Sequence, residues 1–600
     1  MSTSPPPPQA CLLSLPRELR SLIYHFYFKL EGGYVFNRED PYNGKLAMAD
    51  GQPIDLSLMY VCRLITAEAK DLPLQINDVS FSTAYHQDWS PLAGRFEYLS
   101  TLHADIEADL VEHLIRVATP ETHSEILLKF PHLSRFIKSA LRRPIDESPR
   151  VKSDVPWSAI KELTHPHGQG MLGGALYGIR RPFRAPRHND QLHSTFQQAM
   201  TCALETLRQK DPAKFKELIG TAPGCFEPHE FDSLRLDPWA IPSSTELARI
   251  GSKLEDGKVW EALQTWKYPR SEEAVLRVYG RRPFWFRDSE SRHYQSNNVC
   301  YRQAHHFSAA AVAIRFLERL SPSQRLNLRH IVLREDHVSV GQPECHAIGL
   351  IRFCRENPWL RVERYVGLWR NILHGAQSLH LDEMPQVVDN LTKGRRPCVL
   401  GHVKMSLILG SWFGEALAVM DAGMPVGSFT LILDGNPAIN ISSEIFQNTI
   451  QRNVATQRAH ERCFNTHVGN VIRRYEADTW ASMYLLRGMD HLNNQASVIR
   501  CNFNIGPPWD VDKIYEERRE WPFRRWKTKG GSPSPDVYKH NGGYCALKPP
   551  LPTWSSLQLD IFEQRIVPKP ADIEDCEDSV SSWEERNRAP PIRRLALRAL

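Results

Sequence analysis

The feature that most constrains the fold is an amphipathic segment near the start of the chain, which reads LLSLPRELRSLIYHFYF over residues 12–28. Its apolar side chains recur at the spacing of one face of an α-helix. This stripe consists of Leu15, Leu19, Leu22, Ile23 and Phe26. Ser14 predicts the N-cap, and Pro16 is accepted in the first turn because its missing N–H would have no partner there. One helix cannot bury such a stripe alone, so the stripe must contact the rest of this chain or a second protein.

The composition is that of a folded protein with a sizeable core. Apolar residues make up 42% of the 600 positions, and the chain carries 15 Trp, 18 Tyr and 24 Phe. The net charge of +5 is small for this length, which argues against a nucleic acid or a membrane surface as the partner. The 12 cysteines form no C-x-x-C pair, and the first residues lack the pattern of a secretory signal. We therefore expect reduced thiols and a cytoplasmic or nuclear protein.

The most apolar long run extends from Met405 to Met420. It contains Glu415 and is shorter than the ~20 residues that a membrane span needs, so it predicts a buried helix and no membrane partner. Gly410 and Gly414 are four positions apart in this run, a spacing that predicts close packing against another helix.

A second amphipathic segment and two short strands accompany the opening helix. Residues 58–72 carry an apolar face at alternating intervals of four and three, and Pro73 is expected to end this helix. Residues 34–36 and 79–83 have the character of short strands, and their pairing would bring the two helices together.

Shifts in composition divide the chain into five parts. A Pro-rich lead opens it, an Arg- and Gly-rich connection follows the N-terminal helices, and Gly, Pro and Ser dominate the end. The parts are a disordered lead over 1–10, an N-terminal helical module with a short β pair over 11–141, a linker over 142–192, a mixed helix and strand body over 193–529, and a mostly disordered tail over 530–600. The N-terminal module includes helices expected at 103–118 and 131–142. The fold class that follows is α+β.

The body alternates helices with short apolar strands. Strands are expected at 329–334, 360–366, 377–381 and 428–434, and a helix is expected at 346–356. Helix–strand pairs that follow one another in this way are typical of an irregular leucine-rich solenoid, but also of a single α/β domain. Both interpretations are open at this point.

The N-terminal module resembles two related groups of fungal proteins. Leu15-Pro16-Arg17-Glu18-Leu19 and the apolar stripe that it opens are similar to the start of F-box-like proteins. Glu18-Leu19-Arg20 also matches the first motif of a fungal family named for two Glu-x-Arg motifs. Glu68-Ala69-Lys70 stands where the second motif is expected, with lysine in place of arginine. The resemblance covers residues 11–83.

The resemblance implies a protein-interaction adaptor, the substrate-recognition subunit of a cullin-type ubiquitin ligase. In that role the helical face contacts the linker protein of the ligase, and a second domain holds a substrate protein. The contact residues are then Leu15, Pro16, Leu19, Leu22 and Ile23. The alternative is a non-enzymatic scaffold with no ligase link, in which the same residues pack on 58–72 and 79–83 of this chain.

No pattern in the chain predicts an active site, so we expect neither enzyme activity nor a cofactor. The stretch from Gly251 to Val259 has one residue too many for a phosphate-binding loop, and valine stands where a hydroxyl must hold magnesium. Cysteines and histidines do cluster, but their spacing matches no common zinc motif, so we expect buried thiols and imidazoles without a metal. The clustered residues are Cys300, His305, His306, Cys345, His346, Cys354 and His374.

A basic and aromatic segment near the end of the body is a second candidate contact surface. Residues 518–529 interleave three aromatic rings with basic side chains, a mixture that serves protein contact as well as stacking on RNA bases. Its candidate contact residues are Arg518, Trp521, Arg524, Arg525 and Trp526. An RNA-binding protein is therefore the second alternative to the adaptor, although packing of Trp against Arg explains the same pattern.

Overall fold

The fold is described from a computed structural model of the chain, which divides into two compact units. The first unit comprises Met1–Thr265 and Gln303–Phe562, and the second comprises Trp266–Arg302 and Glu563–Leu600. The structure describes residues 12–36, 44–142, 192–221, 227–254, 299–374, 402–467, 481–492, 494, 497–522, 525–526 and 560–566. The expectations for the lead at 1–10, the strand at 377–381, and most of the linker and the tail lie outside these residues.

A small helical module comes first in the chain. It consists of η1 (Leu12–Ser14), α1 (Arg17–Phe28), η2 (Ser57–Tyr60), α2 (Arg63–Ala69) and α3 (Leu72–Ile76). The single helix expected over 58–72 is therefore three short helices. The backbone is extended at Cys62, directly before α2, and Pro73 lies in the first turn of α3 instead of ending a helix.

Seven strands of the first unit form one mixed sheet in the order β2-β1-β3-β5-β6-β7-β8. The strands are β1 (Tyr34–Phe36), β2 (Leu46–Met48), β3 (Val79–Ser82), β5 (His330–Glu335), β6 (Arg361–Gly367), β7 (Phe429–Asp434) and β8 (Ile499–Cys501). Only the pair of β1 and β2 is antiparallel among these seven strands. The expected pairing of 34–36 with the strand near 79–83 is confirmed, with Tyr34 opposite Val79. The fold class is α+β, as expected.

The parallel strands are neighbours in the order in which they occur in the chain. This is the strand order of a solenoid. The connections are far from regular, however, because η6 (Pro343–Leu350) and α17 (Ile351–Glu356) separate β5 from β6, whereas β3 and β5 are separated by all the helices from α4 to α16. One compact unit holds all six parallel strands, so the sheet combines a solenoid-like order with a single shared core.

Side chains alternate between the two faces of this sheet. Ile331, Leu333 and Val366 point into the main apolar core and are fully buried. Arg334 is exposed and Tyr365 is half-buried, because both point to the opposite face. The sheet therefore has one apolar face under the helices and one mostly polar face, on which the apolar Val332 and Ile432 are also buried.

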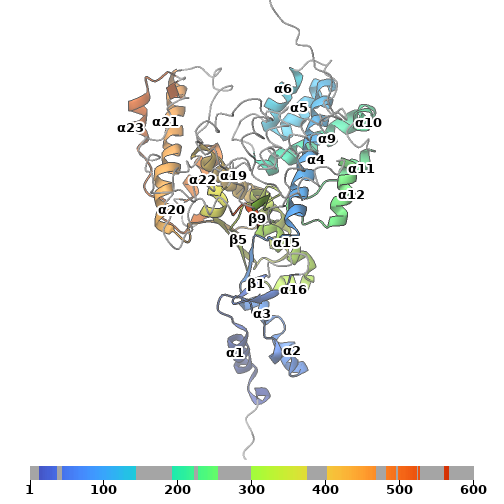
Figure 1. Cartoon of the computed structure of the whole chain (residues 1–600), viewed down its shortest axis with the longest axis vertical. Helices are drawn as coiled ribbons and strands as arrows, with labels where there is room; N and C mark the ends of the chain where they lie inside the picture. The colour runs from blue at the N-terminus through green and yellow to red at the C-terminus, as the bar shows by residue number, and fades with distance from the viewer. Residues whose placement is uncertain are drawn as a thin grey trace, which may run out of the picture. The chain divides into compact units, whose positions relative to one another are not determined.

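Helices supply the rest of the main core. α4 (Ser90–Val117) packs against α6 (Ser134–Leu141), α9 (His193–Lys210) and α12 (Ser244–Leu254), and α15 (Ala309–Arg319) packs against β3 and β5 (Figure 1). The other helices are α5 (Pro120–Lys129), η3 (Pro131–Leu133), α10 (Pro212–Thr221), α11 (Pro228–Ser233), α16 (Pro322–Asn327), η7 (Leu368–Leu373), α19 (His402–Asp421), α20 (Ile439–Ile445), η9 (Phe446–Gln451), α21 (Arg452–His467), α22 (Met483–Leu492) and α23 (Val511–Arg518).

The apolar run at 405–420 is a buried helix, as expected. It lies within α19, which packs against α22. A β-carbon at Gly410 would lie 2.0 Å from Ser482 Oγ, and one at Gly414 would lie 2.4 Å from Leu192 Cδ2, so both glycines allow close packing. Within the part of the chain that the structure describes, no helix has both the length and the apolar character that a membrane span requires.

Two expectations about the domain plan differ from the structure. Residues 11–141 and 193–529 do not form separate domains, because β1 and β3 lie in one sheet with β5 to β8 and α4 packs against α9. Residues 562–566 lie in the tail over 530–600 that was expected to be mostly disordered, but they form β9 (Phe562–Ile566), which pairs with β4 (Val299–Gln303) in a two-stranded sheet. In the second unit, Arg302 donates to Glu563 at 2.5 Å.

Candidate partner-binding surface

α1 has two different apolar faces. Tyr24 and Phe28 are buried and form a small apolar cluster with Ile65 and Ala69 of α2. Tyr24 and Phe28 are four positions apart, so they share one side of the helix, and this side is not the side of the predicted stripe. The helix is therefore fixed to its module by residues outside the stripe.

The predicted stripe is largely exposed. The exposed fractions are 47% for Leu19, 54% for Leu22, 40% for Ile23 and 78% for Phe26. We call these four residues the α1 stripe. Pro16 is also exposed, and Leu15 is half-buried. The alternative expectation, that the stripe packs on 58–72 and 79–83, is wrong for Leu19, Leu22 and Ile23.

A second exposed apolar group lies where η2 leads into α2. Tyr60 is 82% exposed, and Val61 and Leu64 are also exposed. The apolar spacing of 58–72 does not predict these residues, because the apolar face of one continuous helix over this segment omits all three. Large apolar side chains gathered on an exposed surface are typical of a contact with another protein.

An ion pair between the two Glu-x-Arg-like segments holds α1 against α2. Arg20 donates to both carboxylate oxygens of Glu68, at 3.0 and 2.6 Å, and to the carbonyl oxygen of Leu15 at 2.6 Å. The Tyr24 hydroxyl donates to the same carboxylate at 3.1 Å. The hydrogen bond from Arg20 lowers the pKa of Glu68 below its ordinary value, so this carboxylate is ionised at neutral pH. Lys70, which stands in place of the second arginine, is exposed and takes no part in this pair.

The far end of α1 is tied to the sheet. The side-chain amide of Asn77 donates to the carbonyl oxygen of Phe28 at 2.7 Å, and its oxygen accepts the Leu30 N–H at 2.8 Å. Gly33 has φ +64°, and a β-carbon there would lie 2.5 Å from the carbonyl oxygen of Asp78. The α1 stripe is thus held in a defined position relative to β1 and β3.

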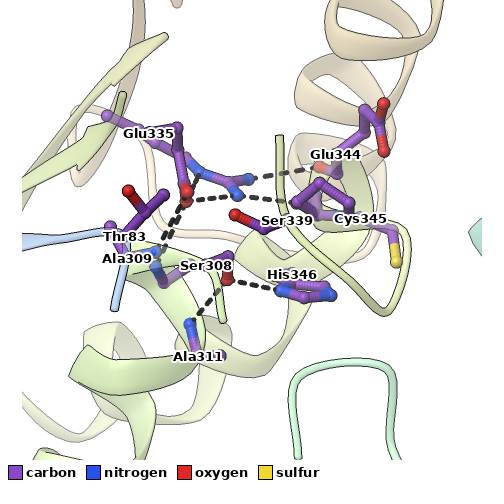
Figure 2. A network of polar contacts seen from close by, with 12 residues as sticks. Thr83, Ser308, Ala309, Ala311, Glu335, Ser339, Glu344, Cys345 and His346 are labelled. Atoms are coloured by element: carbon purple, nitrogen blue, oxygen red, sulfur yellow. Dashed lines mark hydrogen bonds and ion pairs between the residues drawn. The ribbon is translucent and has the colours of Figure 1, made fainter. Parts of the chain in front are cut away.

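The main core contains a network of buried polar residues, which is the other arrangement that could carry chemistry (Figure 2). Arg364 of β6 donates to Glu335 of β5 at 3.0 and 2.7 Å, and both side chains are buried. Glu335 in turn accepts the N–H groups of Ala309 and Ala310 at the start of α15. This pair therefore joins two strands and the start of one helix.

Ser308 and His346 lie next to this pair and contact one another. Figure 2 shows Ser308 between Ala311 and His346: its oxygen accepts the Ala311 N–H at 2.9 Å and lies 2.6 Å from His346 Nδ1. His346 Nε2 lies 2.7 Å from the carbonyl oxygen of Gly341, so Nε2 carries the proton and Nδ1 accepts from the Ser308 hydroxyl. Both side chains are buried, and burial lowers the pKa of His346 to about 3. Because Ser308 is the N-cap residue of α15, we assign the pair to capping of this helix.

The described members of the histidine and cysteine cluster have other partners or are buried thiols. Among the described residues, no group of three or more His, Cys, Asp or Glu side chains could hold a metal ion. The His306 ring stacks on the His337 ring at 4.8 Å, and His346 bonds Ser308 as described above. Cys345 and Cys354 are buried, and burial raises the pKa of both thiols. The side chain of Cys300 lies outside the described residues.

The described residues of the basic and aromatic segment pack on one another and on α21. Trp526 is fully buried in a cluster with Ala459 and Ile514, so its expected role as a contact residue is wrong. The guanidinium of Arg518 lies over Trp521 at 5.1 Å, and that of Arg525 lies over the same ring at 4.4 Å. Stacking on an RNA base needs an uncovered ring, so the RNA-binding alternative loses its main support. Arg524 lies outside the described residues.

Comparisons with known proteins do not identify a relative, so the interpretation depends on the geometry. No protein-family model, curated protein or solved structure matches this chain.

Proposed function

We propose that this chain is an intracellular, F-box-like adaptor that binds the linker protein of a cullin-type ubiquitin ligase through the α1 stripe. The observation that carries the proposal is the exposure of Leu19, Leu22 and Ile23 on a helix that other residues hold in place. The resemblance of residues 11–83 to F-box-like proteins supplies the class of partner. The sheet and helices after this module would then hold a substrate protein.

The energetics of the α1 stripe suit such a contact. Burying one large apolar side chain contributes about 1.5–3 kcal/mol. Four side chains on one helical face can therefore offset the free-energy cost of association, in the manner of a helix that docks into an apolar groove. The Arg20–Glu68 pair adds rigidity, because it fixes the start of α1 before the partner arrives.

The test is a pull-down of the purified linker protein with the full-length chain. We expect the linker to bind the wild type, and we expect Leu19→Asp plus Ile23→Asp to lose at least roughly tenfold in affinity, because two charges would be buried at the contact. The matched control is Leu128→Asp plus Val426→Asp, since Leu128 on α5 and Val426 in the turn before β7 are apolar residues that are 85% and 92% exposed.

Two outcomes would contradict the adaptor. One is equal recovery of the linker by the wild type and the α1 variant, and the other is no recovery by the wild type. The second outcome favours the alternative of a scaffold with no ligase link. Circular dichroism of both variants must match the wild type, which is expected because the substituted side chains are exposed.

A further inference from the structure

The polar face of the sheet carries a row of four side chains in register. Arg334 of β5 lies opposite Tyr365 of β6, Tyr365 opposite Ile432 of β7, and Ile432 opposite Arg500 of β8. Their neighbours along each strand point into the main core, as Leu333 does, so these four side chains point to the other face. The row crosses four adjacent strands of the first unit.

Three arginines on this face are exposed and lack a carboxylate partner among the described residues. They are Arg334 and Arg500 of the row, and Arg361 at the start of β6. The guanidinium of Arg334 lies over the Tyr365 ring at 5.4 Å. Arg361 and Arg500 donate to main-chain carbonyl oxygens close to them in sequence, at 2.8 to 3.1 Å. Several N–H donors of each guanidinium are therefore available to an external acceptor.

The carboxylates on the same face already accept hydrogen bonds from this chain. Asp434 accepts from the side chains of Asn436 and Asn502 at 2.8 and 2.7 Å. Glu363 accepts from the Tyr365 hydroxyl at 2.8 Å. Neutral side chains thus bond both carboxylates, and among the described residues neither carboxylate forms an ion pair with the three arginines. The guanidinium groups therefore remain complementary to added negative charge.

We propose that Arg334, Tyr365 and Arg500, together with Arg361, form a docking surface for an extended acidic segment of a partner protein. Arginine and tyrosine are the residue types that most often dominate such contacts, and guanidinium groups pair with carboxylates through two parallel hydrogen bonds. This surface does not involve the α1 stripe, so it does not depend on the proposed adaptor function.

The geometry sets the spacing of the acidic residues. Neighbouring strands lie about 4.8 Å apart, which places Arg334 and Arg500 about 14 Å apart across the sheet. An extended peptide rises about 3.3 Å per residue, so about four residues cover this distance. The bound segment therefore carries acidic side chains about four positions apart. A protein segment fits better than single-stranded RNA, because Arg334 already covers one face of the only aromatic ring in the row.

The test is fluorescence anisotropy of a labelled Gly-Ser peptide that carries glutamates four positions apart, titrated with the full-length chain. We expect binding that weakens with added salt. Arg334→Glu plus Arg500→Glu should weaken it at least roughly tenfold, because both contacts become repulsive. The matched control is Arg487→Glu, an exposed arginine on α22, which should change the affinity less than about twofold. The same peptide with glutamine in place of glutamate should not bind.

Three results would overturn this assignment. The first is no binding of the acidic peptide by the wild type, and the second is equal binding by the wild type and the Arg334→Glu plus Arg500→Glu variant. The third is a single-stranded RNA probe that binds the wild type more tightly than the peptide does and that no longer binds this variant. Recovery of the ligase linker by the same variant is measured in parallel. Since the variant leaves α1 unchanged, loss of the peptide with retention of the linker separates the two surfaces.

Discussion

Among single residues, Arg364 and Glu335 form the most completely buried ion pair described in the first unit. The free-energy cost of removing the two charges from water is offset, because both the carboxylate and the guanidinium have further hydrogen-bond partners. Arg364 also donates to the carbonyl oxygens of Pro343 and Glu344 at 2.6 and 3.2 Å, and its guanidinium lies over Trp412 at 4.7 Å. A pair of this kind stabilises the fold only while both members are present.

We expect Arg364→Met to lower the free energy of unfolding by about 3–5 kcal/mol, because it leaves the carboxylate of Glu335 buried without its main partner. Adding Glu335→Gln to this variant should recover part of the loss, since the buried charge is then gone. Urea unfolding followed by tryptophan fluorescence measures both. Arg487→Met is the control, with an exposed side chain and little expected change. A variant Arg364→Met within about 0.5 kcal/mol of the wild type would contradict this account.

At the scale of elements, close helix packing at glycines organises the core around α19. α22 approaches α19 at Gly410 and Gly414, and its own Gly488 faces Phe413 of α19. A β-carbon at Gly488 would lie 2.1 Å from Phe413 Cδ2. Phe413 is fully buried, so it has little room to move away.

Gly488→Ala should therefore lower the free energy of unfolding by about 1–3 kcal/mol, the usual cost of forcing an extra methyl group into a packed core. Thermal unfolding followed by circular dichroism measures the change. Gly220→Ala is the matched control, because Gly220 is also helical but a β-carbon there would meet no atom within 4 Å. We expect the control to match or exceed the wild type, since alanine favours helix over glycine. Equal losses in the two variants would refute the packing explanation.

At the scale of the whole molecule, the sheet joins parts of the chain that lie far apart in sequence. β3 pairs with β5 over four residues, with Val79 opposite Ile331 and Ser82 opposite Arg334. α4 packs against α9 and α12 (Figure 1). The residues before 142 thus supply two inner strands and a long helix to a core that the later residues complete.

From this arrangement we expect residues 192–566, expressed alone, to lack a cooperative unfolding transition. Co-expression with residues 12–142 as a separate chain should yield a complex that purifies through a tag on either chain, because the β3–β5 pairing and the α4–α9 contact restore the core. Size-exclusion chromatography and thermal unfolding measure both results. Cooperative unfolding of 192–566 alone, at the midpoint of the full chain, would be inconsistent with a shared core.

Much of the secondary structure could be predicted from local spacing. The strands near 329–334, 360–366 and 428–434 and the buried helix at 405–420 all occur, because their apolar periodicity is strong. The segment 58–72 was harder to predict. Its apolar spacing fits one helix, but the extended backbone at Cys62 and the position of Pro73 in α3 divide it among three short helices. Domain boundaries could not be predicted, because the pairing of β3 with β5 leaves no pattern in the sequence near either strand.

The candidate surfaces also differ in how far the sequence predicts them. The α1 stripe was visible as a pattern, but the pattern did not tell whether the stripe faces the core or the solvent. The Arg334–Tyr365–Arg500 row was missed altogether, because it exists only when four strands lie in register. Trp526 was misjudged for a related reason, since a basic and aromatic segment looks the same whether its rings are exposed or buried.

By itself, the sequence determined many of the segments that form helices or strands and which of their residues share a face, because backbone geometry repeats at a constant period. Only the tertiary structure decided which of the two apolar faces of α1 is buried. Tyr24 and Phe28 meet Ile65 and Ala69, and Arg20 meets Glu68, so the opposite face is left to the solvent. Burial depends on partners that lie far away in the chain, and the period of one helix carries no information about them.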